Sequence, residues 1–283
     1  MKNVFGKSKI KLGVTGFART GKTVFIGSLS HALLTADSRD HNNGLGPLSQ
    51  FAPYEKKSFR CASVRNDVHA DLPQFSLRQV RDSLGGKSAQ WPVPTEGISH
   101  LVLKLDCLIK TRLIDYEKEV QLDLIDYPGE WIADFPMLEQ DYHTWSDHMM
   151  LRSKKGSRAE LCEEFENAIR DTNADEVNED VIGRLSEFWE QYLIEASAKG
   201  LVFNQPGRLL RPDNLRASPI LRLFPLPVAK RNGSLGNKMN ERFEEYKKKV
   251  IMPFYEDYFA RIDRQIVLVD ILRTLQLGEE AFG

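Results

Sequence analysis

The sequence of 283 residues predicts an α/β fold joined to a mainly helical part. Two observations carry this prediction. First, a glycine-rich stretch at residues 16–23 stands between a strand pattern and a helix pattern. Second, helical periodicity dominates between residues 132 and 262, after which a strand pattern returns. We therefore expect one core built from residues 1–131 and 263–283, with residues 132–262 as a mainly helical insertion.

The glycine-rich stretch has suitable elements on both sides. Residues 10–15 alternate in polarity like a strand, and residues 24–34 carry apolar side chains at helical spacing. Residues 16–23, which we call the glycine loop, read G-F-A-R-T-G-K-T and match the phosphate-binding pattern G-x-x-x-x-G-K-[ST] in full. Backbone N–H groups and a helix N-terminus converge on phosphates in this arrangement. The residues expected to contact a bound nucleotide are Gly16, Phe17, Ala18, Arg19, Thr20, Gly21, Lys22, Thr23 and Val24.

Individual side chains of the glycine loop have distinct expected roles. Gly16 and Gly21 let the backbone turn tightly and approach the ligand. Lys22 would reach the β- and γ-phosphates, and Thr23 would offer its hydroxyl to Mg²⁺. Arg19 has two interpretations. It stabilises transition-state charge from within the loop, or it is an exposed residue of which only the backbone N–H matters, and we favour the second.

Further elements of the core follow the loop. Residues 76–84 have a helix pattern that ends at Gly85, and residues 98–105 and 119–126 have strand patterns separated by a hairpin connection. Residues 265–270 have the apolar character of a buried central strand in a parallel sheet. Within the insertion, helical periodicity marks residues 158–169, 178–199 and 239–264.

An acidic residue ends the second of these strands. Asp126 begins the run D-Y-P-G, and a carboxylate at the carboxyl end of a strand beside the first would hold Mg²⁺, usually through water. Gly129 leaves its N–H available to a γ-phosphate. Glu130 stands where many GTPases carry the glutamine that orients the attacking water, and its carboxylate either acts as the base or is simply solvated.

Thr95 completes the candidate site. It lies just before the strand that would pair with the Asp126 strand, where small GTPase-like folds carry a threonine that closes over Mg²⁺ and γ-phosphate. The alternative is an ordinary threonine before a strand. The catalytic candidates are therefore Lys22, Thr95, Gly129 and Glu130, and the metal candidates are Thr23, Thr95 and Asp126.

Composition narrows the class of protein. Lysine and arginine total 39 and aspartate and glutamate total 40, a net charge of −1 that gives no electrostatic reason to expect a nucleic-acid partner. The three cysteines have no disulfide or zinc spacing, which is typical of a reducing compartment, so we expect a cytoplasmic protein. No apolar run approaches about 18 residues, so no transmembrane segment is expected.

Several runs together resemble a known family. They are G-F-A-R-T-G-K-T-V-F at residues 16–25, W-P at 91–92 followed by Thr95, D-Y-P-G-E-W at 126–131, Q-P-G-R at 205–208, L-F-P-L-P at 223–227 and D-R-Q-I-V-L-V-D at 263–270. The chain resembles, over nearly its whole length, the YcjX-like family of bacterial stress-associated P-loop NTPases. The resemblance implies a Ras-like core with a helical insertion that binds GTP or GDP with Mg²⁺. It also implies a role in stress responses and an association with a membrane protein. We expect the helical insertion to be the surface that contacts a protein partner.

One family motif falls outside these residues. Members continue beyond the strand at 265–270 to a further strand ending in T-K-A-D, which reads guanine, and the 283 residues do not include it. We therefore expect a core that is incomplete at its C-terminal end, and no residue is assigned to base recognition. The favoured function is a GTPase switch that hydrolyses GTP to GDP. An ATPase with the same core, and a nucleotide-binding scaffold with negligible turnover, remain the alternatives.

Overall fold

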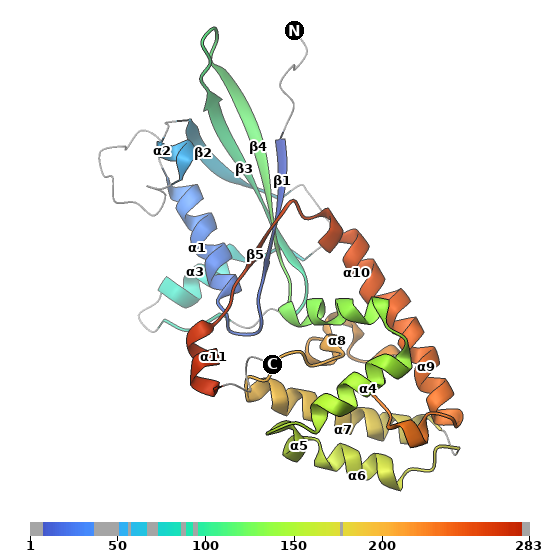
Figure 1. Cartoon of the computed structure of the whole chain (residues 1–283). Helices are drawn as coiled ribbons and strands as arrows, with labels where there is room; N and C mark the ends of the chain where they lie inside the picture. Colours follow the sequence, from blue (N-terminus) through green and yellow to red (C-terminus); the bar gives the residue numbers. More distant parts are fainter. Residues whose placement is uncertain are drawn as a thin grey trace. The chain divides into compact units, whose positions relative to one another are not determined.

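The computed structural model describes residues 8–36, 51–55, 58–66, 73–85, 89–92, 96–175 and 178–278. The chain divides into two compact units. The first comprises Met1–Tyr127 and Arg261–Leu268, and the second comprises Pro128–Ala260 and Val269–Gly283. Helices and a sheet with parallel pairs are both present, which confirms the predicted α/β class (Figure 1).

The first unit contains a five-stranded mixed sheet with strand order β2-β3-β4-β1-β5. Strand β1 pairs in parallel with β4 on one side and with β5 on the other, whereas β2, β3 and β4 pair antiparallel. Figure 1 shows β3 and β4 as a long hairpin. The strands are β1 Ser8–Thr15, β2 Phe59–Arg65, β3 Ser99–Ile109, β4 Tyr116–Asp126 and β5 Arg264–Val267.

The strand predictions are largely confirmed, with two differences. The hairpin strands β3 and β4 extend to Ile109 and from Tyr116, so their connection is residues 110–115 and shorter than predicted. Strand β5 pairs in parallel as expected, but it forms an edge of the sheet in the described residues, and Val267 is 60% exposed. The prediction of a buried central strand there was wrong, because a short apolar run such as I-V-L-V suits an edge as readily as a centre.

Helices pack against the sheet of the first unit. They are α1 Lys22–Thr35, α2 Ala52–Glu55 and α3 Leu77–Gly85, so the helices predicted at residues 24–34 and 76–84 are confirmed. Helices α1 and α3 approach each other closely, since a Cβ placed on Gly27 would lie 2.6 Å from Cγ1 of Val80. The core between helices and sheet includes Val14, Ile26, Leu33, Phe59, Val80, Leu103 and Leu124.

The described secondary structure of residues 128–260 is entirely helical. Periodicity at residues 178–199 predicted one helix correctly, while Cys162 divides the segment at 158–169 into two helices. The α-helices of the second unit are α4 Tyr142–Ser153, α5 Arg158–Leu161, α6 Glu163–Asp171, α7 Glu179–Ala198, α8 Gly207–Leu210, α9 Ser234–Tyr246, α10 Met252–Asp257 and α11 Ile271–Leu277. The 3₁₀ segments with residues in this unit are η1 Gly129–Glu139, η2 Asp213–Leu215, η3 Pro219–Leu221, η4 Val228–Lys230 and η6 Phe259–Arg261. A π-helical turn, η5 Lys247–Ile251, joins α9 to α10.

Aromatic side chains fill the core of the second unit around one glutamine. The ring centroids of Phe165 and Trp189 are 4.8 Å apart, and those of Trp145 and Phe243 are 5.4 Å apart. Buried indole N–H groups need acceptors. The Trp145 indole donates to Oε1 of Gln205, and the Trp189 indole donates to the backbone oxygen of Gln205, both at 3.1 Å. The segment around Gln205 is therefore fixed inside the aromatic core.

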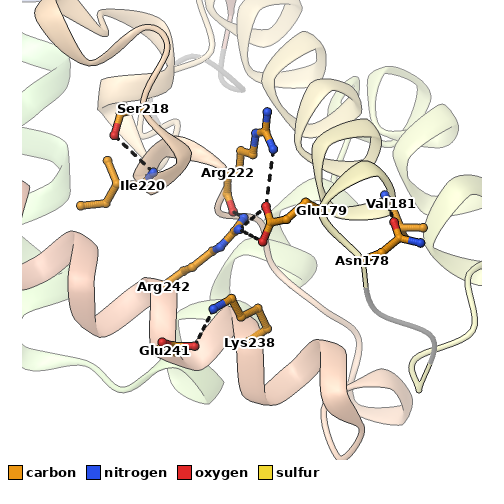
Figure 2. Close-up of polar contacts among 9 residues, drawn as sticks. All are labelled: Asn178, Glu179, Val181, Ser218, Ile220, Arg222, Lys238, Glu241 and Arg242. Atoms are coloured by element: carbon orange, nitrogen blue, oxygen red, sulfur yellow. Dashed lines mark hydrogen bonds and ion pairs between the residues drawn. The ribbon is translucent and has the colours of Figure 1, made fainter.

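A charged cluster joins α7, α9 and the segment after η3 (Figure 2). Both carboxylate oxygens of Glu179 accept from one guanidinium nitrogen of Arg242 at 2.7 Å, and Arg222 lies 3.5 Å from the same carboxylate. The Arg242 side chain is only 6% exposed, while Glu179 is 56% exposed. Glu179 also stands in the first turn of α7, where the helix dipole favours a negative charge. This carboxylate therefore satisfies a guanidinium that has little access to water.

Replacing Glu179, the partner of a buried guanidinium, should lower the free energy of unfolding more than replacing the partner of an exposed cation. We expect Glu179→Gln to lower the free energy of unfolding by about 1–2 kcal/mol, because Arg242 stays buried while Glu179 itself is partly screened by solvent. The control is Glu241→Gln, which removes only the exposed pair of Glu241 with Lys238 and should change stability by less than about 0.5 kcal/mol. Urea unfolding followed by tryptophan fluorescence measures both. Equal losses would contradict this account.

Candidate functional site

The glycine loop joins β1 to α1 in the first unit, and its lysine is folded over it. Lys22 is 6% exposed, and its ammonium donates to the backbone oxygens of Gly16 at 2.6 Å and Phe17 at 3.2 Å. Thr20 closes the turn by donating its backbone N–H to the Phe17 oxygen at 3.3 Å. The ammonium is thus held at the mouth of the loop by two carbonyl groups, which an anion could replace as its partner.

Both loop glycines are required by the backbone, for different reasons. Gly16 has φ 154°, and a Cβ there would collide with the backbone oxygen of Leu268 and with the Thr20 hydroxyl. Gly21 has φ 91° and precedes the first turn of α1 in a left-handed conformation, although the space around it is open. Arg19 also has positive φ, at 68°, and its side chain is exposed.

Strand register brings Asp126 to the edge of the sheet from which the glycine loop leaves. Asp126 lies opposite Val14 in the parallel β1–β4 ladder, two residues before Gly16. Parallel neighbours end at the same edge, so the last residue of β4 and the first residues of the loop are neighbours in space. The Asp126 residue is 2% exposed. The structure therefore brings together Asp126 and the start of the loop, two parts that sequence spacing separates by more than a hundred positions.

Thr95 lies outside the described residues. Strand β3 begins soon after it, at Ser99, which is paired with Asp126 in the antiparallel ladder. Thr23 is in the first turn of α1 and is partly buried.

Glu130 lies in the second unit at the start of η1 and is 4% exposed. The alternative in which its carboxylate is simply solvated was therefore wrong. Gly129 opens the same element and is also buried. The backbone at Glu130 is closely covered, since a Cβ on Gly207 would collide with the Glu130 carbonyl oxygen. Only glycine at position 207 permits this approach.

A buried polar network fixes η1 within the second unit. Asp134 accepts from the Gly207 N–H at 2.7 Å and from the Tyr246 hydroxyl at 2.6 Å. Burial raises the pKa of Asp134 to about 6, against the opposing effects of both hydrogen bonds and of the Arg208 charge. The Arg208 guanidinium lies 3.2 Å from the ring centroid of Trp131. Sequence reasoning missed this network, and the run Q-P-G-R at residues 205–208 was its only signal.

Comparison with known proteins identifies the family to which the chain belongs. A family model described as "YcjX-like family, DUF463" matches residues 10–283. The chain belongs to the YcjX-like family. A relative named "Ras-like GTPase YcjX" from Escherichia coli (strain K12) is 33% identical over 292 residues, covering 97% of this chain and 60% of the relative. A second protein of that name, from Shewanella oneidensis, is 31% identical over 296 residues, covering 96% and 60%.

The resemblance to the YcjX-like family predicted from the quoted runs is thus confirmed. The chain spans about 60% of the length of the curated relatives it matches. Within the described residues, no helix combines the length and the apolar character that crossing a membrane requires.

The Asp134 network should make stability depend on pH in a defined direction. Because the pKa of Asp134 is about 6 in the folded protein and near 3.8 in an unfolded chain, the native state binds more protons between these values. Stability from this group is therefore lost as pH rises through that window. Between about pH 4.5 and about pH 7.5 we expect the wild type to lose about 2 kcal/mol relative to Asp134→Asn. Urea unfolding at several pH values measures the difference.

Asp147 provides a control of opposite sign. A hydrogen bond from the buried Arg231 guanidinium, at 2.7 Å, lowers the pKa of Asp147. The stability that Asp147 contributes is present above its ordinary pKa and is lost as pH falls. Asp147→Asn should therefore be less stable than the wild type mainly at neutral pH, and the difference in the free energy of unfolding should shrink as pH falls. A pH-independent difference between the wild type and Asp134→Asn would show that Asp134 titrates normally.

Proposed function

We propose that this protein is a nucleotide-binding P-loop NTPase and acts as a Mg²⁺-dependent GTPase that hydrolyses GTP to GDP. The observation that carries the proposal is the complete glycine loop between β1 and α1, with the Lys22 ammonium held over the carbonyls of Gly16 and Phe17. The names of the two relatives favour guanine over adenine. The first unit is then a Ras-like nucleotide-binding core, and residues 132–262 are a helical insertion in it.

Binding of phosphates follows from the groups in the loop. The Lys22 ammonium exchanges its two carbonyl partners for β- and γ-phosphate oxygens, a charge-assisted contact stronger than the one it replaces. Backbone N–H groups from Phe17 to Val24 surround the phosphates, and the N-terminus of α1 adds its dipole. The exposed Arg19 contributes through its backbone, with transition-state stabilisation by its guanidinium as the alternative.

Hard oxygen donors at the same edge fit Mg²⁺. The Thr23 hydroxyl begins α1, and the Asp126 carboxylate ends the neighbouring strand β4, which is the donor chemistry that Mg²⁺ prefers. Thr95 would complete the set. Bound Mg²⁺ would supply charge neutralisation for the phosphate oxygens. Asp126 would hold its place through the parallel ladder, which keeps the carboxylate at the sheet edge.

Hydrolysis requires a group that orients the attacking water or accepts its proton. Gly129 would donate its N–H to the γ-phosphate, and Glu130 would orient the water or accept its proton. Burial at 4% exposure suits the carboxylate to this task, because a water-excluded base interacts strongly with its substrate. An ATPase of the same core and a non-hydrolysing scaffold are the alternatives. For all three we propose a cytoplasmic, stress-related role with a protein partner on the helical insertion.

Glu130 separates the enzyme from the scaffold. Glu130→Ala should lower the single-turnover rate by about 10²- to 10⁴-fold while nucleotide affinity changes little, because the contact is made near the transition state. Glu130→Gln, which keeps a group able to orient water, should retain more of the rate. Single-turnover hydrolysis with saturating Mg²⁺, first with GTP and then with ATP, measures both effects.

The matched control is Glu139→Ala, at the exposed far end of the same η1 element, which should hydrolyse like the wild type. Equal rates for Glu130→Ala and the wild type would remove Glu130 from the mechanism. Hydrolysis of ATP faster than GTP would favour the ATPase alternative.

A further inference from the structure

A cleft of about 350 Å³ opens within the second unit, and its lining includes none of the residues assigned above to phosphate, metal and water. It is bordered by η1, by α4 and the turn after it, and by the segment that carries Phe203 and Gln205. This volume is at the lower end of the range of about 300–1,000 Å³ that is typical of ligand sites.

The formally charged side chains in the lining of the cleft are all positive. They are Arg152 and Lys155, and the lining contains no carboxylate. Neither Arg152 nor Lys155 forms an ion pair with any residue that the structure describes. Burial, followed by the nearby charge of Arg158, lowers the pKa of Arg152. Arg158 adds to the positive potential, since its guanidinium donates only to neutral groups, at Tyr192, Asn204 and Val202.

The half-buried Arg152 guanidinium at the cleft and the buried Arg158 guanidinium near it form no ion pair with any residue that the structure describes, so their positive charge is not neutralised there. Bringing an anion to this place would recover Coulomb energy that water supplies poorly in a cleft. Gln205, which also lines the cleft, cannot serve as that partner, because its amide is engaged with the Trp145 indole and the Ala133 carbonyl. The ligand therefore needs at least one negatively charged oxygen group.

The remaining wall of the cleft is apolar and continues beyond it. Met149 is buried at the cleft, while Phe203 is 49% exposed and Leu151 is 61% exposed. Phe203 has φ 59°, a left-handed conformation that is strained for an aromatic residue, and its ring lies 5.4 Å from the Arg152 guanidinium. The fold thus retains a strained phenylalanine that presents an aromatic face beside an unpaired cation.

We propose that this cleft binds an acidic peptide segment of a partner protein, with a carboxylate on Arg152 and Lys155 and an apolar side chain against Phe203 and Met149. A peptide suits the surface better than a small molecule does, because the apolar area extends out of the cleft onto Leu151. Aromatic and arginine side chains that lie next to each other, as Phe203 and Arg152 do, are typical of the residues that dominate protein interfaces.

Fluorescence anisotropy with the full chain and the labelled peptide EFDLEF tests this proposal. Lys155→Gln should weaken binding about fivefold and Arg152→Gln at least about tenfold, since each loses a charge-assisted contact. The matched control is Lys154→Gln, which removes the same charge from the adjacent exposed residue outside the cleft lining and should leave affinity unchanged. The neutral peptide QFNLQF should bind no better than background.

Phe203→Gly separates binding from folding. Glycine relieves the positive φ, so the melting temperature should stay the same or rise while peptide affinity falls. Equal losses for Lys154→Gln and Lys155→Gln would overturn the proposal, since they would indicate non-specific charge attraction. No binding of EFDLEF up to about 1 mM would also overturn it. If free phenylpropionate binds at least as tightly as the peptide, the proposal of a peptide ligand is overturned and the cleft binds a small carboxylate instead.

Discussion

The parallel pairing of β1 with β4 is the constraint on which the candidate site depends. Its register places Val14 opposite Asp126, so the glycine loop and the only carboxylate assigned to metal emerge from adjacent strands at one edge. A shift of the ladder by one residue would turn the Asp126 side chain to the opposite face of the sheet. The pairing is secured by apolar side chains on both strands, including Leu124 at 1% exposure, rather than by the polar groups themselves.

A second constraint acts inside the helical unit. Gln205 binds two tryptophans of the aromatic core, and two residues later the Gly207 N–H binds Asp134 and its Cα lies against the Glu130 carbonyl. The backbone at Glu130 is therefore held by contacts within the second unit. If Glu130 acts on the attacking water, the helical unit positions that group, and changes in its core would alter turnover as well as stability.

Local patterns were sufficient to predict local structure, and long-range contacts were not. Alternation at residues 10–15 and helical spacing at 24–34 predicted β1 and α1, because each pattern follows from which face of its own element is buried. The edge strand β2 was missed, since most of its side chains are exposed and carry no clear alternation. The network at Asp134 could not be predicted, because its partners Gly207 and Tyr246 come from positions more than 70 residues away. Thr95 lies outside the described residues and stays a prediction.

The most direct test of the central claim is equilibrium dialysis of the full chain against labelled GTP and Mg²⁺, with unlabelled ATP or GTP as competitor. Our account predicts that the wild type binds GTP, that GTP competes better than ATP, and that Lys22→Ala binds at least about tenfold more weakly. A wild type that retains neither nucleotide, or a Lys22→Ala variant with unchanged affinity, would contradict the assignment of the glycine loop to phosphate binding.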